Sequence, residues 1–311
     1  MRYRLVVLDV DGTLLDSTHA LRPRVAAAVR AAQAAGLHIA LATGKLLGSV
    51  LPLMRAMDLS GPQIVLNGAA VMGKTGAPLR FCPLREADRR EVIQTVRACD
   101  PTVLASHFAL DGIYMDEEHP LIRILAEYGE GPPTFVPDLL DGGLPPAAKI
   151  LLSSAPSQLA ALRAQVTPLL AARVTITTTT PDFLEFFDPA AGKGQALVAL
   201  RAWLGIPKEA VVAVGDGEND LSLLAEAGLA VAMGNAAPAL LRAADRVLPS
   251  NDEDGAALIL EELTQEARDA CRSSGRNLTP SPSARLKSRS TPGGASRYAR
   301  ASLSGAGRGA R

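Results

Sequence analysis

The first apolar run of the chain, Leu5–Leu8, is followed at once by two carboxylates, Asp9 and Asp11, and then by Gly12 and Thr13. A strand that ends this way delivers both acids to the carboxyl edge of a sheet, where open α/β proteins place their chemistry. Side chains alternate along an extended segment, so the two carboxylates point the same way, about 6–7 Å apart. Two like charges this close repel each other, and a bound cation relieves the repulsion. The alternative interpretation is a solvated strand-to-helix turn, in which the Asp11-Gly12 pair only reverses the chain.

Strand-like and helix-like segments alternate at both ends of the chain. The early segments are expected to be strands at residues 5–8, 37–42 and 63–66 and helices at 23–35 and 46–57. The late segments are expected to be helices at residues 194–204, 220–227 and 237–243 and strands at 211–214, 229–232 and 246–248. Single helices between successive strands imply parallel pairing with crossovers. The sequence therefore predicts an α/β fold with a Rossmann-like parallel-sheet core.

The middle of the chain, residues 82–188, has a different pattern of predicted strands and helices, and it is called the cap segment below. Its β-like runs are expected at residues 102–108, 112–115, 149–153, 174–180 and 183–187, with helices at 86–98, 120–128 and 156–171. We interpret the cap segment as an inserted α+β domain, and a core split in this way predicts a lid over the site. The predicted core is formed by residues 1–81 and 189–264.

Charge is spread unevenly along the 311 residues, although 32 basic and 32 acidic residues give a formal net charge of zero. Nine basic and no acidic residues lie from Arg272 to the end, which leaves 23 basic and 32 acidic residues in positions 1–271, a net charge of −9. Such an acidic body argues against a nucleic-acid-binding surface, which needs clustered Lys and Arg. Residues 265–311 are predicted to be a disordered basic tail, because a segment rich in Ser, Arg, Gly and Pro buries too little apolar surface to fold.

The cysteines and the hydropathy of the sequence indicate the cellular compartment of the protein. The three cysteines, Cys82, Cys99 and Cys271, are too few and too scattered for a disulfide framework or a zinc site, so they are interpreted as reduced thiols. Only four apolar residues separate the basic start from Asp9, and no stretch approaches about 18 uninterrupted apolar residues. We therefore expect a soluble cytoplasmic protein, monomer or homodimer, whose partner is a small molecule and neither a membrane nor a nucleic acid.

Four motifs lie where predicted strands end. They are Asp9/Asp11/Thr13, Thr43-Gly44, Lys193 between two glycines, and Gly215-Asp216-Gly217-Glu218-Asn219-Asp220. A hydroxyl and backbone N–H groups that open a helix, as in the second motif, suit a phosphate oxygen. The third motif adds a point positive charge, and the fourth adds carboxylates and an amide. Together they supply acids for Mg²⁺, a nucleophile, and donors for a transferring phosphoryl group.

Each later motif also has a plainer interpretation when it is taken alone. Thr43-Gly44 suits a helix cap, Lys193 suits a solvated surface, and the loop that ends at Asp220 suits a cap of the next helix. All of these plainer interpretations would have to hold together, in this order and at strand ends, for the chemical interpretation to fail.

Two other binding loops are excluded by their spacing. A calcium loop needs a glycine five residues after its first aspartate and a glutamate at its twelfth position, and neither Asp9 nor Asp216 is followed by them. A P-loop needs a glycine five residues before Gly44 and a Ser or Thr after Lys45, and both are missing.

In order and spacing these motifs resemble those of the haloacid dehalogenase (HAD) superfamily of hydrolases. The resemblance is specifically to the Cof-type phosphatases, whose type IIB cap is a large α/β insertion after the third core strand. It spans roughly residues 3–263 and is carried by the stretches 9–14, 42–44, 67–69, 192–194, 215–220, 232–236 and 250–255.

The resemblance implies a covalent mechanism and a metal. Asp9 would attack the phosphoryl group and become an aspartyl phosphate. Asp11 would protonate the leaving oxygen and then take a proton from the water that cleaves the intermediate. The carboxylates of Asp9 and Asp216 and the backbone carbonyl of Asp11 would hold Mg²⁺, and Asp220 would orient the water shell of the metal.

The resemblance also implies which residues hold the substrate. The phosphoryl oxygens would be bound by Val10, Thr43, Gly44, Lys193 and Asn219. Thr13 would steady the nucleophile loop, and the candidate substrate contacts are Lys45, Asn67 and Asn235. Many Cof-type members have arginine where this chain has Lys45, and lysine keeps the charge but loses the planar fork. In the cap segment, the candidate lining residues are His107, Tyr114, Phe135 and Lys149.

An acid at position 11 favours phosphatase or phosphomutase chemistry, because relatives that pump ions have threonine there and dehalogenases lack the acid. The expected function is a Mg²⁺-dependent phosphomonoesterase of small phosphorylated metabolites, with sugar phosphates as the leading class. The alternatives are a phosphomutase or phosphotransferase on the same scaffold and a non-catalytic relative that senses metabolites.

Overall fold

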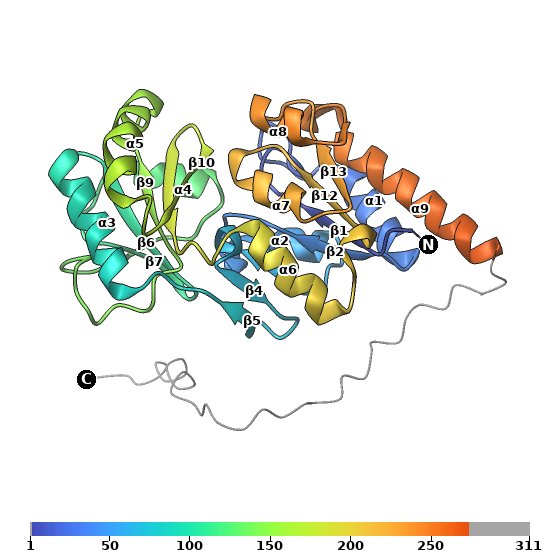
Figure 1. Ribbon diagram of the computed structural model, residues 1–311, viewed down its shortest axis with the longest axis horizontal. Coiled ribbons are helices and arrows are strands. Elements are labelled where there is room, and N and C mark those ends of the chain that lie inside the picture. The colour runs from blue at the N-terminus through green and yellow to red at the C-terminus, as the bar shows by residue number, and fades with distance from the viewer. Residues whose placement is uncertain (1, 274–311) are drawn as a thin grey trace, which may run out of the picture. The chain divides into compact units, whose positions relative to one another are not determined.

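The structure is a computed structural model that describes residues 2–273. Its first sheet has the strand order β14-β13-β12-β1-β2 (Figure 1). The strands are β1 (Leu5–Leu8), β2 (His38–Leu41), β12 (Val211–Gly215), β13 (Leu229–Ala232) and β14 (Arg246–Val247). Every neighbouring pair is parallel. The predicted α/β class with a parallel-sheet core is confirmed, and both ends of the described chain contribute strands to it.

Helices cover both faces of this sheet, as the unbroken apolar run of β1 requires. On one face, Val6 and Leu8 pack in the same cluster as the pair formed by α1 (Pro23–Ala34) and α9 (Gly255–Ser273). On the other face, Leu5 and Val7 pack with α6 (Lys193–Leu204) and α7 (Leu221–Ala225). The remaining helices of the core are α2 (Leu47–Ala56) and α8 (Pro238–Ala243).

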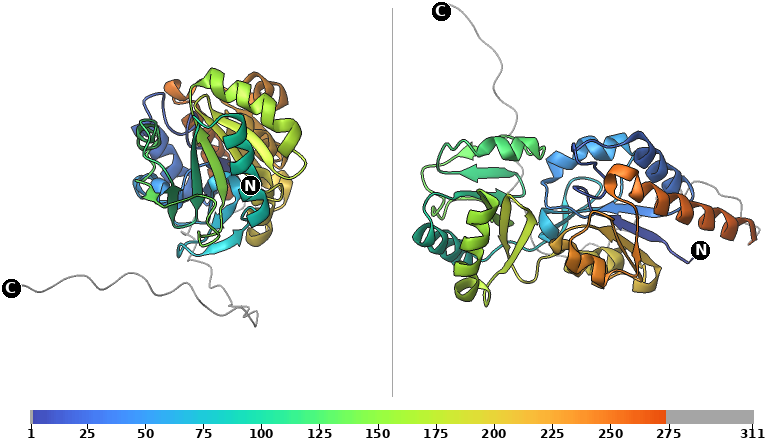
Figure 2. Two further views of the ribbon diagram at one scale, coloured as in Figure 1. Left: turned by 90° about the vertical axis from the view of Figure 1, so that its left-hand side faces the viewer. Right: turned by 90° about the horizontal axis from the view of Figure 1, so that it is seen from above.

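The cap segment builds a six-stranded sheet of its own, in the order β10-β11-β9-β6-β7-β8. Its strands are β6 (Leu104–Ala109), β7 (Gly112–Met115), β8 (Thr134–Phe135), β9 (Lys149–Ser153), β10 (Thr175–Thr180) and β11 (Phe183–Phe187). Its helices are α3 (Glu86–Cys99), α4 (Ile122–Glu127) and α5 (Pro156–Leu170). Figures 1 and 2 show α3 and α5 together on one side of the sheet, where they share a hydrophobic cluster with it.

A small antiparallel sheet, β3-β4-β5, leads from the core into the cap segment. Its strands are β3 (Gln63–Val65), β4 (Ala70–Met72) and β5 (Pro78–Phe81). β3 lies next to the end of β2, where Ala42 and Ile64 form an isolated parallel bridge. The third strand was predicted in the right place, but the hairpin of β4 and β5 was not predicted.

The predicted start of the tail at residue 265 is too early, because α9 continues to Ser273. Its buried face extends through Leu260, Leu263 and Ala267, a helical spacing that keeps one side against the core. The sequence predicts an end near Thr264 because large apolar residues stop there, although the small Ala267 continues the buried face. The rest of the predicted tail, residues 274–311, lies outside the described residues.

The described residues fall into one compact unit, so the predicted boundaries at residues 81/82 and 188/189 stay a prediction. Within residues 2–273, no helix combines the length and the apolar character needed to cross a bilayer.

Gly68 allows the turn after β3 to pass against the start of α6. It has φ +87°, and a Cβ there would lie 2.1 Å from the carbonyl oxygen of Gly192. Gly36, which ends α1, has φ +90°, and a Cβ there would have no neighbour within 4 Å. The two glycines therefore share a left-handed backbone and differ in the space around them.

We expect Gly36→Ala to lower the free energy of unfolding by about 1–2 kcal/mol, the cost of a left-handed L-residue. Gly68→Ala should lose a further ~1–3 kcal/mol because the methyl group overlaps backbone atoms that cannot yield. Denaturant unfolding of both variants measures the difference. Equal losses would show that the approach of residue 68 to Gly192 carries no stability.

Candidate active site

The two acidic motifs meet because β1 and β12 are neighbouring parallel strands. Leu8 is level with Val214 in their register, and the Asp9 N–H donates to the Val214 carbonyl at 3.0 Å. The chain leaves both strands at the same edge of the sheet, so Asp9 and Asp216 enter one space. Carboxylate oxygens of Asp9, Asp216 and Asp220 lie within 4.8 Å of one another. The first and last sequence motifs thus form a single acidic cluster.

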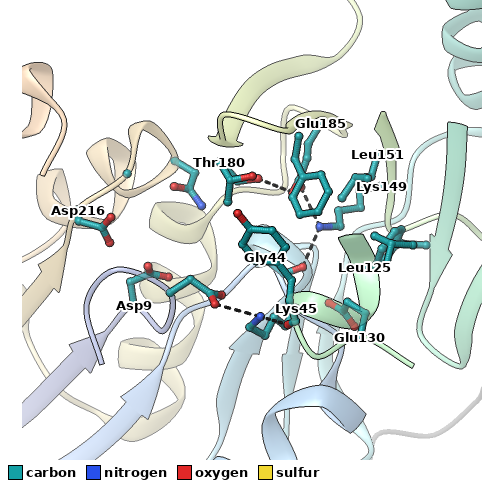
Figure 3. A pocket seen from close by; sticks show the side chains of 17 residues that line it. Asp9, Gly44, Lys45, Leu125, Glu130, Lys149, Leu151, Thr180, Glu185 and Asp216 are labelled. Atoms are coloured by element: carbon teal, nitrogen blue, oxygen red, sulfur yellow. Dashed lines mark hydrogen bonds and ion pairs between the residues drawn. The ribbon is translucent and has the colours of Figure 1, made fainter. Parts of the chain in front are cut away.

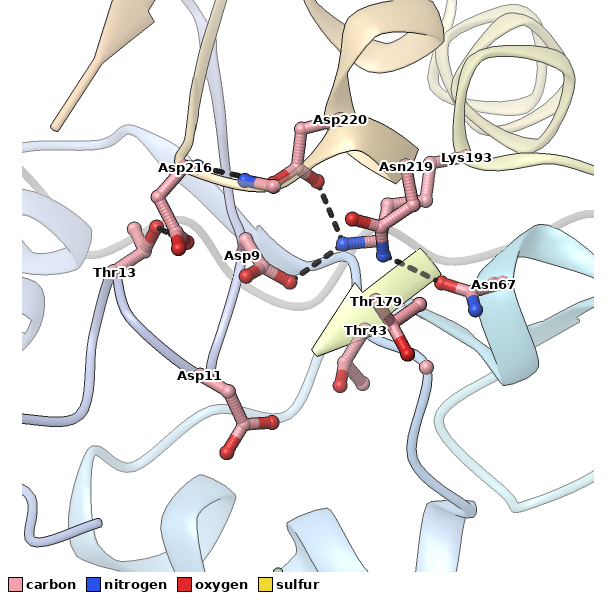
Figure 4. A network of polar contacts seen from close by, with 12 residues as sticks. Asp9, Asp11, Thr13, Thr43, Asn67, Thr179, Lys193, Asp216, Asn219 and Asp220 are labelled. Atoms are coloured by element: carbon pink, nitrogen blue, oxygen red, sulfur yellow. Dashed lines mark hydrogen bonds and ion pairs between the residues drawn. The ribbon is translucent and has the colours of Figure 1, made fainter. Parts of the chain in front are cut away.

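Lys193 joins this cluster from the start of α6, directly after Gly192. Its Nζ lies 2.6 Å from Asp9 Oδ1 and 2.6 Å from Asp220 Oδ1 (Figure 4). The side chain is 1% exposed, and a buried ammonium needs partners of opposite charge. Burial opposes the charged form, but Asp220 and then Asp9 outweigh it and raise the pKa of Lys193. The lysine is therefore a fixed positive charge inside the cluster.

One lysine does not neutralise three carboxylates. Burial, and then the charge of Asp220, raise the pKa of Asp216 to about 7. The same two causes raise the pKa of Asp9 well above its ordinary value, although Lys193 opposes them. This excess of buried negative charge, presented by oxygen atoms alone, fits a divalent cation. Asp9 and Asp216 are placed to hold it.

The loop that follows β1 and carries Asp9 and Asp11 contacts the loop after β12. Gly12 has φ +75°, and a Cβ there would lie 2.3 Å from Asp216 Oδ2, so only glycine permits this approach. Thr13 Oγ1 donates to Asp216 Oδ1 at 2.9 Å. Asn235 Nδ2 donates to the Gly12 carbonyl at 2.9 Å. These contacts fix the backbone carbonyls and carboxylates of the two loops relative to each other.

Asp220 organises its own loop as well as Lys193. Its Oδ2 accepts hydrogen bonds from the N–H groups of Asp216 and Gly217, each at 3.0 Å. The carboxylate therefore holds the backbone that carries Asp216 while its other oxygen contacts the lysine.

Two hydrogen-bonded asparagine side chains, Asn219 and Asn67, connect the core with the cap segment and are called the amide relay below. Asn219 Nδ2 donates to Asn67 Oδ1 at 2.8 Å, and Asn67 Nδ2 donates to Glu185 Oε2 at 2.5 Å. The backbone around Asn67 is left-handed at three successive residues, with φ 54° at Leu66, 52° at Asn67 and 87° at Gly68. Such a conformation costs about 1–2 kcal/mol at a leucine, and strain of this kind persists where the surroundings fix it.

A pocket of ≈ 530 Å³, counting its open mouth, lies between the acidic cluster and the cap segment (Figure 3). Its core wall includes Asp9, Asp11, Gly44, Lys45, Asp216 and Asn219. Its cap wall includes Phe108, Tyr128, Glu130, Lys149, Phe183 and Glu185. The nucleophile predicted from the sequence therefore faces residues that lie about a hundred positions or more away along the chain.

Strand alternation explains which cap residues reach the pocket. Lys149 and Leu151 of β9 and Phe183 and Glu185 of β11 line it, whereas the residues between them pack toward α3 and α5. Successive strand residues point to opposite faces, so one face of the sheet carries the helices and the other forms the pocket wall. Lys149 Nζ lies 2.9 Å from a carboxylate oxygen of Glu185 and donates to the Gly44 carbonyl at 2.8 Å.

Asp11 has a lysine and a histidine as neighbours. Lys45 Nζ lies 3.1 Å from Asp11 Oδ1 and also donates to the Tyr128 carbonyl of the cap segment. His19 Nδ1 lies 3.5 Å from the same Asp11 oxygen. The rings of His19 and Tyr128 meet edge to face, with centroids 4.8 Å apart. Lys45 thus contacts both the predicted acid and the cap segment.

Val10, Thr43, Asn67 and Asn235 are not among the described residues that line the pocket, and their predicted roles stay predictions. The Thr43 hydroxyl accepts the Lys45 N–H at 3.1 Å, and the Val10 carbonyl accepts the Leu14 N–H at 2.9 Å. Asn67 belongs to the amide relay, and Asn235 joins Gly12 to the loop that starts at Ser250. The amides of Asn67 and Asn235 are engaged by protein groups, and their contact with a substrate stays a prediction.

Of the four cap candidates, only Lys149 lines the pocket. His107 is buried, its Nε2 lies 2.9 Å from the Pro145 carbonyl, and burial lowers its pKa to about 4. Tyr114 donates to Asp111 at 3.1 Å, and Phe135 is 48% exposed. These three residues are not among the described residues that line the pocket, in agreement with the plainer interpretation of each as ordinary packing or surface.

Sequence reasoning missed His19, Tyr128, Glu130 and Glu185. The run of β11 carries one usable signal, since Glu185 is a charged residue between apolar neighbours in a strand. His19, Tyr128 and Glu130 lie in turns and at the end of a short helix, and no spacing in the sequence marks them.

Known proteins are similar to this chain over most of its length. The family model of haloacid dehalogenase-like hydrolases matches residues 6–260. An HMP-PP phosphatase of Serratia proteamaculans is 30% identical over 242 residues, 76% of this chain and 86% of the relative. The 5-amino-6-(5-phospho-D-ribitylamino)uracil phosphatase of Bacillus subtilis is 25% identical over 269 residues, 83% of this chain and 96% of the relative. A haloacid dehalogenase-like hydrolase from Bacteroides thetaiotaomicron has a TM-score of 0.74 at 26% identity, covering 84% of this chain and 99% of that one.

An endoribonuclease of Arabidopsis thaliana chloroplasts is also matched, at 26% identity over 269 residues and 82% of this chain. There this chain spans only 46% of the relative's length. The activity in that protein's name is not transferred to this chain.

The chain belongs to the haloacid dehalogenase-like hydrolases. It is an enzyme, and the two relatives described above that it covers over most of their length are phosphatases.

The raised pKa values predict how pH acts on the metal-free protein. An acid whose pKa rises from 3.8 to about 7 on folding, as for Asp216, contributes stability that is fully present below the lower value and lost as the pH rises through the upper one. We expect the melting temperature to fall over this range. A divalent cation competes with the proton, so its stabilisation should be greater above a pH of about 7 than below it.

Thermal unfolding with Mg²⁺ and with a chelator measures both effects. At about a hundredfold excess over its dissociation constant, the cation should add about 2.7 kcal/mol. Asp216→Asn is the control, because it removes the titrating group and a ligand together and should flatten both dependences. Equal stabilisation of wild type and Asp216→Asn would place the cation elsewhere.

Proposed function

We propose that the chain is a Mg²⁺-dependent phosphomonoesterase that hydrolyses small phosphorylated metabolites, with sugar phosphates as the leading class, in the cytoplasm. The observation that carries this proposal is the meeting of Asp9, Asp11 and Asp216 at one end of a pocket whose far wall is the cap segment. The phosphatase names of the relatives support the reaction type.

The first half of the reaction is a transfer to Asp9. A carboxylate oxygen of Asp9 forms a bond to phosphorus while the bond from phosphorus to the ester oxygen breaks. Asp11, which lines the same pocket, gives a proton to the departing oxygen. Lys193 holds Asp9 Oδ1 at 2.6 Å and so fixes the orientation of the nucleophile.

The second half regenerates the enzyme. Asp11 takes a proton from water, the water oxygen attacks phosphorus, and the bond to Asp9 breaks to release inorganic phosphate. Asp9, Asp216 and the Asp11 carbonyl would hold Mg²⁺, which supplies positive charge against the phosphoryl oxygens. Backbone N–H groups of Val10 and Gly44, together with Thr43 and Asn219, are the other groups we assign to those oxygens.

Closure by the cap segment excludes water from the transfer. Arg163 of α5 holds both carboxylate oxygens of Glu218, at 2.9 and 2.7 Å, two residues beyond Asp216. Lys149 and Glu130 add contacts to Gly44 and Ser49 on the core side. A site bounded in this way favours transfer to one ordered water over side reactions.

We expect Asp9→Asn to lower the rate of phosphate release by at least about three orders of magnitude, because an amide cannot replace the covalent nucleophile. Release of inorganic phosphate from p-nitrophenyl phosphate and a set of metabolites, with Mg²⁺, measures it. Asp58→Asn is the matched control, since Asp58 is exposed and has φ 54°, which asparagine tolerates. An active Asp9→Asn enzyme would refute the covalent route, and activity that requires an added acceptor would favour a phosphotransferase.

A further inference from the structure

The positive charges that line the pocket are already paired. Among the described lining residues the only cations are Lys45 and Lys149. Lys45 contacts Asp11 and the Tyr128 carbonyl, and Lys149 contacts Glu185 and the Gly44 carbonyl. Both lysines are more than nine-tenths buried. Neither offers a charge to a second anionic group on a substrate.

Glu130 fills the remaining position where an anion could be held on this side. One of its oxygens accepts the Leu46 N–H at 3.2 Å, and the other accepts the Ser49 hydroxyl at 2.5 Å. These groups open α2, whose first backbone N–H groups attract negative charge. Glu130 also separates the pocket from a second hollow of ≈ 710 Å³, whose wall includes Gly48, Gly112 and Pro132. Burial raises the pKa of Glu130, but the Ser49 hydroxyl and the charges of Lys149 and Lys45 favour its carboxylate form. Its side chain supplies no positive charge.

The rest of the cap wall suits an uncharged partner. Phe108, Leu151 and Phe183 present apolar surface, which strengthens any charge repulsion nearby by keeping water away. Thr179 and Thr180 line the same wall and place hydroxyl groups beside it. Glu185 accepts hydrogen bonds from Thr179, at 2.8 Å, and from Asn67, and it pairs with Lys149. Its role is therefore to engage Lys149, so a carboxylate or a second phosphate would find no free cation and would face Glu130.

We propose that the pocket selects phosphate monoesters whose leaving group is uncharged, and that Glu130 and Glu185 reject leaving groups that carry a second anion. This inference rests on the proposed phosphomonoesterase function and names its substrate class. Rejection acts through two features at once: like charge at the cap wall, and lysines that are fully engaged by the protein.

Two probes test the proposal, because they differ at a single carbon. Sorbitol 6-phosphate ends in a hydroxymethyl group where 6-phosphogluconate ends in a carboxylate. We expect kcat/KM with Mg²⁺ to be at least about a hundredfold higher for sorbitol 6-phosphate, and calorimetric binding to differ in the same direction. Equal kcat/KM and equal binding of the two probes would overturn the proposal.

Variants assign the selection to its residues. Glu130→Gln keeps the volume and removes the charge, and we expect it to lower the preference for sorbitol 6-phosphate by about tenfold or more. Glu185→Gln frees Lys149 and should act in the same direction through a different group. Glu127→Gln, an exposed acid on α4 three residues from Glu130, should leave the preference unchanged. A preference that no pocket variant alters, or that Glu127→Gln alters equally, would contradict the assignment.

Failure of this inference and failure of the proposed function give different results. Hydrolysis of p-nitrophenyl phosphate with no preference between the probes keeps the phosphatase and removes the charge selection. Preferential binding of sorbitol 6-phosphate without any hydrolysis keeps the charge selection and removes the phosphatase.

Discussion

The contact of Lys193 with Asp9 and Asp220 is the interaction on which the site depends. Three carboxylates gathered within 4.8 Å would drive the loops apart if no cation stood among them. A buried lysine at 2.6 Å from two of them makes the cluster tolerable inside the fold. Burial and then the charge of Asp220 still raise the pKa values of Asp9 and Asp216. The remaining negative charge is what a divalent cation would neutralise, so the fold stores part of its binding free energy as unrelieved repulsion.

Close backbone approaches and left-handed residues help to hold the loops of the site in this arrangement. Gly12 passes against Asp216, and Gly68 passes against Gly192, at distances that exclude any Cβ. Between them, the left-handed Leu66 and Asn67 turn an amide toward both Asn219 and Glu185. The left-handed leucine costs conformational free energy, whereas the glycines and the asparagine adopt this backbone more readily. Strain is therefore concentrated in the turns that bring distant parts of the chain into one site.

The sequence was sufficient for the core and for the acidic cluster, because both follow from local rules. An apolar strand ending in acids specifies a place at a sheet edge, and parallel pairing of β1 with β12 then brings Asp9 to Asp216. The cap wall follows no such rule. Glu130 and Tyr128 reach the pocket from the end of a short helix and its turn, and their position depends on how the cap segment folds as a whole. Lys149 and Glu185 obey strand alternation, yet their partnership requires the pairing of β9 with β11, which the sequence does not reveal.

The two ends of the pocket use charge in opposite ways. At the core end the acids outnumber the lysine, and the imbalance leaves a place for a cation and, through it, for the phosphoryl group. At the cap end Lys149 is matched by Glu185, and Glu130 occupies the opening of α2, so no place is left for a second anion. A substrate with one phosphate therefore has a single favourable orientation, with its charge toward Asp9 and its uncharged part toward Phe108 and Phe183. Under the proposed charge selection, this orientation would bring the ester oxygen to the side of Asp11, which lines the same pocket.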